Sequence, residues 1–128
     1  MPIHYTIDEA RKRIYTRCEG MVTYTELRAH INTDLDAAAA SYDEIFDCGD
    51  AKTNVTALDI RSLVGERQKV AQRQAPAPVA VVATNNKFFG LLRMFDMLTE
   101  DIRPMRVFRS KIEAEQWLEE IASRKGKI

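Results

Sequence analysis

The sequence predicts an α/β fold with one mixed, mostly parallel sheet of about five strands, one antiparallel edge strand and four helices. The first observation is the order β-β-α-β-α-β-α-β-α, in which segments with strand alternation are followed by segments with helical spacing. The second is residues 79–84, which are apolar without alternation, as in a parallel strand covered on both faces. Short connections between parallel strands imply right-handed crossovers.

The composition is typical of one globular domain. The chain has 128 residues, 30% charged and 45% hydrophobic, which excludes disorder, a coiled coil, collagen and a disulfide miniprotein. Nineteen basic residues balance nineteen acidic ones, so nucleic acid is not an expected partner. No run approaches the ~20 apolar residues of a membrane span and no signal peptide is recognisable. We therefore expect a cytoplasmic single domain over residues 1–128, with 125–128 as a frayed tail.

The first half of the chain predicts a hairpin, a helix and a strand. Apolar residues alternate over 3–7 and over 14–18, which indicates two antiparallel strands. A capping box at Thr23 and Glu26 opens a helix expected over about 23–40, with an apolar stripe of Leu27, Ile31, Leu35 and Ala38. The strand over 42–48 begins with acidic residues and is expected to emerge from solvent.

The second half repeats the alternation of helix and strand. A polar loop over 47–56 leads to a helix that opens at Thr56 and Asp59, a weaker capping box, and ends before the prolines of residues 75–78. The strand over 79–84, a helix over 86–100 and an edge strand over 105–109 follow. The last helix opens at the capping box of Ser110 and Glu113.

Sequence motifs for the common chemistries are absent. The five glycines are widely separated, so there is neither a dinucleotide-binding fingerprint nor a P-loop, and no nucleophile elbow occurs. His4 and His30 have no neighbours at metal-ligand spacing, so we expect no metal and no cofactor. Cys18 and Cys48 are expected to be small buried hydrophobes; a disulfide or redox pair is the alternative.

The loop over 47–56 is the first candidate binding region. It joins the carboxyl end of an expected internal strand to a helix N-terminus, the edge where open α/β sheets bind ligands. Exposed amides there favour an anion or a phosphorylated side chain. Alternatively, Thr56 is only an N-cap and the rest is a solvated turn. The candidate anion-binding, ligand-binding or phospho-acceptor residues are Asp47, Asp50, Lys52, Thr53, Asn54 and Thr56.

The helix over 86–100 is the second candidate. Its apolar side chains span roughly 220°, about twice the stripe of a surface helix. Such a helix is either deeply buried, or a self-association face, or one wall of an apolar ligand pocket. The interface or pocket residues would be Phe88, Leu91, Leu92, Met94, Phe95, Met97 and Leu98.

Basic residues form the third candidate. They lie in the hairpin turn and in the helix that follows the loop, where they are interleaved with acids and lack clustered aromatics. A solvated face is therefore favoured over nucleic-acid binding. The residues concerned are Arg11, Lys12, Arg13, Arg61, Arg67, Lys69 and Arg73.

The chain resembles the STAS fold, the sulfate transporter and anti-sigma factor antagonist domain, and most closely its bacterial SpoIIAA-like branch. The residues that carry the resemblance are 19–23, 89–94, and 107–110 with Ala114, Trp117 and Leu118. In the anti-sigma factor antagonists, an Asp-Ser pair at the start of the second conserved helix carries the phosphorylated serine. The corresponding residues 47–56 contain no serine, so Thr53 or Thr56 would take this role.

This resemblance implies a module that binds or regulates without catalysis, and the lipid-binding side of the fold implies an apolar ligand. We favour a non-catalytic STAS-like module, acting as a homodimer through a protein partner or a small ligand. The second hypothesis is a carrier of a lipid or small apolar ligand, with the helix over 86–100 lining the pocket. The third is an enzyme that uses Asp47, Asp50 and Lys52 as acid, base and electrostatic groups.

Overall fold

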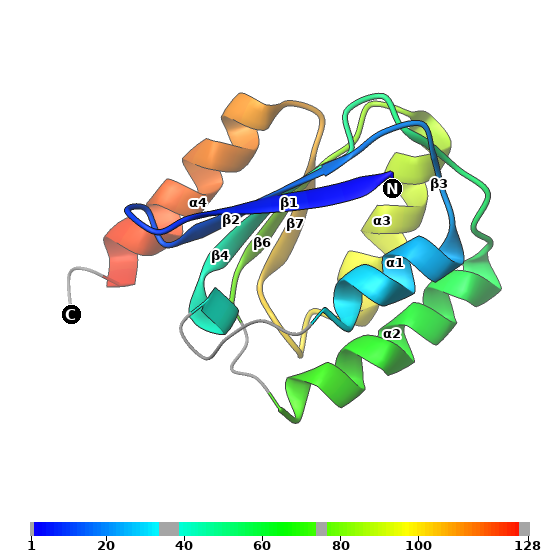
Figure 1. Cartoon of the computed structure of the whole chain (residues 1–128), viewed down its shortest axis with the longest axis horizontal. Helices are drawn as coiled ribbons and strands as arrows, with labels where there is room; N and C mark the ends of the chain where they lie inside the picture. The colour runs from blue at the N-terminus through cyan, green and yellow to red at the C-terminus, as the bar shows by residue number, and fades with distance from the viewer. Residues whose placement is uncertain (1, 34–38, 74–76, 126–128) are drawn as a thin grey trace.

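The computed structural model describes the whole chain except residues 1, 34–38, 74–76 and 126–128. At its centre is a five-stranded sheet with the order β1-β2-β4-β6-β7 (Figure 1). β1 and β2 are antiparallel, and all other neighbours are parallel. The predicted α/β class and the antiparallel edge strand are therefore confirmed. The strands are β1 Ile3–Asp8, β2 Arg13–Cys18, β4 Asp43–Asp47, β6 Val79–Val82 and β7 Met105–Phe108.

The described residues form four α-helices, which cover the two faces of the sheet unequally (Figure 1). α1 (Tyr24–Ile31), α2 (Ala57–Ala71) and α3 (Asn86–Leu98) lie on one face, and α4 (Lys111–Lys125) lies on the other. The alternation of side chains along each strand separates the two cores. In β4, Phe46 packs in the core beneath α1–α3, whereas Ile45 packs with Ala114 and Leu118 of α4.

The predicted capping residues start the helices. The hydroxyl of Thr23 accepts the N–H of Glu26, whose carboxylate accepts the backbone N–H of Thr23 in return. Thr56 and Asp59 form the same reciprocal pair at α2. Ser110 accepts the N–H of Glu113 at the start of α4. Each helix start depends only on two residues that are three positions apart in the sequence, which explains why the sequence predicts it.

Two helices are shorter than predicted. α1 ends at Ile31 rather than near residue 40, because both the backbone N–H and the side-chain amide of Asn32 donate to the carbonyl of Arg28. A separate 3₁₀ turn, η1, covers Ala39–Ser41. α3 ends at Leu98 rather than at residue 100. The hydroxyl of the next residue, Thr99, donates to the carbonyl of Phe95 in the last turn. Of the expected features, Leu35, Ala38 and the tail at 126–128 lie outside the described residues.

A second, smaller sheet is absent from the sequence-based expectations. β3 (Met21–Val22) pairs in parallel with β5 (Lys52–Thr53). Two-residue strands are too short to show an alternation, so no pattern predicts them. This pairing draws the loop over 47–56 inward and buries Cys48, Ala51, Thr53 and Val55. The interpretation of this loop as a solvated turn is therefore wrong for these four residues.

The two cysteines behave as predicted. Cys18 and Cys48 are free and buried. The last residue pair between β2 and β4 is Arg17 with Asp47, and the two cysteines come directly after it. Burial, together with the contact with Cys18, raises the pKa of the Cys48 thiol well above its ordinary value. A thiol of this kind is inert and apolar in character.

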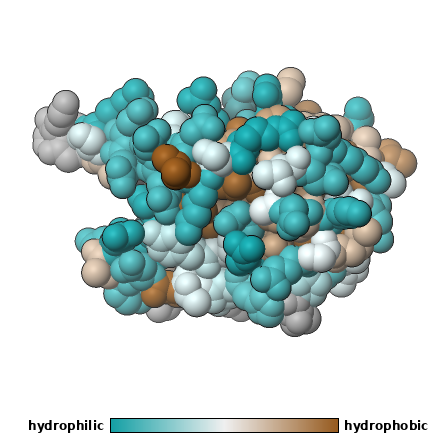
Figure 2. Space-filling model, turned by 90° about the horizontal axis from the view of Figure 1, so that it is seen from above, coloured by the Kyte–Doolittle hydropathy of each residue, from teal (hydrophilic) through white to brown (hydrophobic). Residues whose placement is uncertain are grey.

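Large exposed hydrophobic residues are distributed over several elements. They are Tyr5, Met21, Leu58, Met97, Leu98 and Ile112. On the face seen in Figure 2, hydrophilic side chains predominate and hydrophobic ones occur in small groups. No helix in the described part of the chain is both long and apolar enough to cross a membrane.

Candidate ligand-binding cavity

A cavity of about 130 Å³ lies between the sheet and the three helices α1, α2 and α3. The sheet contributes Glu44 near the start of β4, Val79 at the start of β6 and Met105 at the start of β7. The cavity is therefore at the amino ends of the parallel strands. The loop over 47–56, which the sequence indicates as the ligand-binding edge, lies at the opposite, carboxyl ends.

Most of the cavity wall is apolar. All three helices supply side chains, which are Leu27, Ile31, Ile60, Leu63, Leu92 and Phe95. Tyr5 also lines the cavity and is 41% exposed, so the cavity reaches the surface at β1. An apolar wall excludes water and strengthens every charge interaction inside it.

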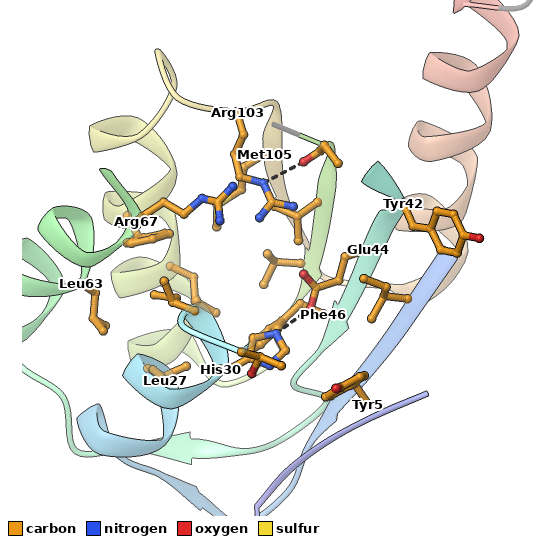
Figure 3. Close-up of a pocket in the computed structure, with 18 of the residues that line it drawn as sticks. Tyr5, Leu27, His30, Tyr42, Glu44, Phe46, Leu63, Arg67, Arg103 and Met105 are labelled. Atoms are coloured by element: carbon orange, nitrogen blue, oxygen red, sulfur yellow. Dashed lines mark hydrogen bonds and ion pairs between the residues drawn. The ribbon is translucent and has the colours of Figure 1, made fainter. Parts of the chain in front are cut away.

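Glu44 is the centre of a buried polar network. Its Oε2 atom accepts the hydroxyl of Thr16 at 2.7 Å and lies 2.8 Å from Nε2 of His30 (Figure 3). Thr16 comes from β2 and His30 from α1, so the contact joins the sheet to the first helix. Glu44 is only 9% exposed.

The surroundings of Glu44 keep it ionised. Burial by itself disfavours the carboxylate, but the charge and hydrogen bond of His30, the charge of Arg103 and the hydroxyl of Thr16 outweigh burial. Together they lower the pKa of Glu44 to about 2. At neutral pH the cavity therefore contains one fixed negative charge.

Arg103 enters the cavity from the segment before β7. Its Nε donates to the carbonyl of Ala77 at 2.8 Å, which fixes the side chain against the start of β6. Burial and the neighbouring charge of Arg67 lower the pKa of Arg103 to about 10, despite the opposite effect of Glu44. Arg103 stays protonated at neutral pH, in surroundings that disfavour its charge.

Arg67 enters from α2 and is the cavity residue with an unsatisfied buried atom among the residues that the structure describes. It is only 7% exposed, and its Nε is buried without a hydrogen-bond partner among the residues that the structure describes. Burial lowers its pKa, and only the charge of Glu44 opposes this. Figure 3 shows the side chains of Arg67 and Arg103 reaching toward each other on one side of the cavity, across from Glu44 and His30. A buried guanidinium nitrogen without a hydrogen-bond partner is rare in a folded protein.

Three interpretations from the sequence of charged residues as solvated are wrong. Arg67 was expected on a solvated face but lies in the cavity. Arg13 was expected in the exposed hairpin turn, yet it is 7% exposed and its Nε lies 2.8 Å from Oδ1 of Asp43. The acidic start of β4 was expected to emerge from solvent, but Glu44 is buried. For Arg13 and Glu44, a partner from a distant segment replaces water, whereas the buried Nε of Arg67 has no hydrogen-bond partner among the described residues.

The candidate residues of the loop over 47–56 have different surroundings. Asp47 accepts the N–H of Gly49 at 2.9 Å and pairs with Arg17 at 3.4 Å. Thr53 is buried, and its hydroxyl donates to the carbonyl of Val22 at 2.7 Å. The hydroxyl of Thr56 is the N-cap acceptor of α2. The side chains of Asp50, Lys52 and Asn54 are exposed. Three of the six candidate side chains therefore have protein partners, and the other three face solvent.

The candidate residues of the third helix separate into three groups. Phe88 and Leu92 are buried in the core, and Leu91, Met94 and Phe95 are half-buried. Met97 and Leu98 remain 64% and 48% exposed at the end of α3. Of the seven, Leu92 and Phe95 line the cavity. One helix therefore supplies core and cavity wall and leaves its last turn uncovered.

The polar residues of the cavity carry a signal that was available in the sequence. Arg67 lies seven residues after Ile60 and four after Leu63, on the apolar side of α2. Glu44 shares its strand face with Phe46. A charged residue at a core-facing position is the mark of a buried, functional charge, and it can be found without a structure.

Within the described residues, no group of three or more His, Cys, Asp or Glu side chains could hold a metal ion. No model of a known family, no curated protein and no solved structure matches this chain. The resemblance to STAS domains therefore stays a prediction from the sequence.

Proposed function

We propose that this chain is a non-catalytic binding module that holds a compact, largely apolar molecule in the cavity beneath α1, α2 and α3. The observation that carries the proposal is the cavity itself, with its apolar helices and a few converging polar groups. This combination is typical of small-molecule sites. A cytoplasmic location, a homodimer and a STAS-like regulatory role belong to the same proposal.

The volume of the cavity favours a small ligand over a lipid. An apolar cavity of about 150 Å³ in another protein binds benzene, and this cavity is about 130 Å³. Drug-sized ligands use pockets of roughly 300–1,000 Å³. One ring or a short branched chain therefore matches the space, whereas a long acyl chain exceeds it.

A homodimer would use the exposed end of α3. Met97 and Leu98 are exposed side by side there, next to the half-buried Met94. Met side chains suit adaptable contacts. Sedimentation of the wild-type chain over a range of concentrations tests this part of the proposal, which a monomer at all concentrations would contradict.

Native mass spectrometry tests the binding function. We expect wild-type protein, as purified, to carry a bound small molecule, and added benzene to raise the melting temperature by several degrees. Ala77→Leu introduces a larger side chain at a buried position on the cavity wall and should abolish both effects. Ala57→Leu, on the exposed first turn of α2, is the matched control and should retain them.

An unliganded mass together with an unchanged melting temperature in benzene would contradict the proposal. Equal effects in wild type and Ala77→Leu would show that the molecule binds elsewhere, which contradicts it as well.

A further inference from the structure

The charges that line the cavity are unbalanced. Glu44 is the only carboxylate among the described lining residues, and it faces two guanidinium groups, those of Arg67 and Arg103. His30 supplies a further hydrogen-bonding group and no negative charge. The Oε2 atom of Glu44 already accepts from Thr16 and contacts His30. The positive charge of the lining residues therefore exceeds their negative charge.

Arg67 is the group that this imbalance leaves without a partner. More than nine-tenths of the residue is buried, its Nε has no hydrogen-bond partner, and its side chain reaches into the cavity (Figure 3). It forms neither a hydrogen bond nor an ion pair with any residue that the structure describes. A buried cation of this kind is unfavourable unless an anion pairs with it.

We infer that the ligand of this cavity is a small carboxylate with a compact apolar body, whose oxygens accept hydrogen bonds from the guanidinium of Arg67. The inference rests on the proposed function, because it specifies the ligand of the same cavity. A planar guanidinium matches the geometry of a carboxylate and can donate two parallel hydrogen bonds to it. The apolar body then packs against side chains such as Leu63 and Phe95.

Arg103 acts as a positioning residue. The carbonyl of Ala77 holds its Nε at 2.8 Å, so the group is fixed before any ligand arrives. Its positive charge adds to the potential that attracts an anion. Because Glu44 faces both arginines, its single negative charge cannot neutralise both Arg67 and Arg103. Burial and, after it, the charge of Arg67 lower the pKa of Arg103, and a bound carboxylate would offset the repulsion between the two arginines.

Benzoate and benzamide provide the test, because they have nearly the same shape and differ in charge. We expect benzoate to bind the full chain at neutral pH at least about tenfold more tightly than benzamide, the difference expected for a hydrogen bond to a charged group. Binding is measured by NMR titration, in which the resonances of cavity residues such as Leu63 and Leu92 should shift.

Variants of two arginines on α2 identify the group responsible. Arg67→Met keeps the unbranched apolar stem of the side chain and removes the buried charge, so the protein should fold and the preference for benzoate should disappear. Arg67→Lys keeps the charge without the planar fork and should retain part of the preference. Arg61→Met is the matched control, since Arg61 is exposed on the same helix and the net charge changes equally.

The outcomes separate the two proposals. Equal affinity of wild type for benzoate and benzamide would overturn the carboxylate inference and leave the binding function intact. A benzoate preference that survives Arg67→Met would also overturn the inference. If neither compound shifts the cavity resonances at millimolar concentration, both proposals fail.

Discussion

The two ends of strand β4 place a carboxylate in opposite surroundings. At the carboxyl end, Asp47 accepts an N–H from Gly49, two residues away, and pairs with a mostly exposed Arg17. At the amino end, Glu44 is buried among groups from two other elements, β2 and α1, and from the segment before β7. At the first end, the carboxylate has a backbone partner in its own loop and an ion pair at the surface. The second end leaves the buried Nε of Arg67 unpaired.

The difference between the two ends of β4 indicates which edge of the sheet binds a ligand. Open α/β sheets usually bind ligands at the carboxyl ends of their strands, and the loop over 47–56 is at that edge. Its polar side chains, however, largely serve the loop and the start of α2. Unsatisfied buried charge is found at the other edge. In this molecule, the missing partner is therefore a better guide to the site than the usual position in the fold.

Replacing each carboxylate by its amide should give the largest contrast. Glu44→Gln removes the negative charge that contacts His30 and faces Arg67 and Arg103, so we expect a loss of about 3–5 kcal/mol in the free energy of unfolding. Asp47→Asn can keep the bond to Gly49 and should lose less than about 1 kcal/mol. Urea unfolding of both variants measures the difference. Similar losses in both would show that the two ends of β4 are energetically equivalent.

Acid should remove the contribution of Glu44. Its pKa is about 2 in the folded chain against 4.5 as the ordinary value, so its stabilisation is fully present above pH 4.5 and is lost as the pH falls through about 2. The shift corresponds to about 3 kcal/mol. The stability difference between wild type and Glu44→Gln should narrow by this amount on acidification. A stability difference between the two proteins that stays constant with pH would contradict the lowered pKa of Glu44.

A smaller effect is expected from the buried hydroxyl of the loop. Thr53→Val removes the bond to the carbonyl of Val22 and the acceptor for the N–H of Val55, at a cost of about 1–2 kcal/mol. Thr56→Ala, which removes the exposed N-cap of α2, should cost about 1 kcal/mol. Thermal unfolding compares the two. A neutral Thr53→Val would show that the β3–β5 pair does not depend on this hydroxyl.

The sequence predicts well whatever depends on neighbouring residues. Capping boxes at Thr23 and Thr56 are pairs three residues apart, and they start α1 and α2 as expected. The apolar run at β6 is covered on both faces, as its lack of alternation indicates. The predicted end of α1 near residue 40 is wrong, because alanines further along the chain favour helix. The helix ends at Ile31, and Asn32 is its C-cap, with the side-chain amide bonded to the carbonyl of Arg28.

The cavity could be predicted only in part. The position of Arg67 on the apolar side of α2 indicates burial, but not which charge it faces. Its neighbours Glu44 and Arg103 lie 23 and 36 residues away along the chain. Crossovers bring these segments together, and pairing over such distances leaves no periodic pattern in a single sequence.

The sequence by itself determined the elements of this protein, their order and the faces that they bury, because these follow from the periods of helix and strand and from local capping. Only the tertiary structure decided which edge of the sheet holds unsatisfied charge. Burial is a property of the assembled layers, and a guanidinium becomes costly to leave unpaired only when α2 and the sheet have excluded water from it.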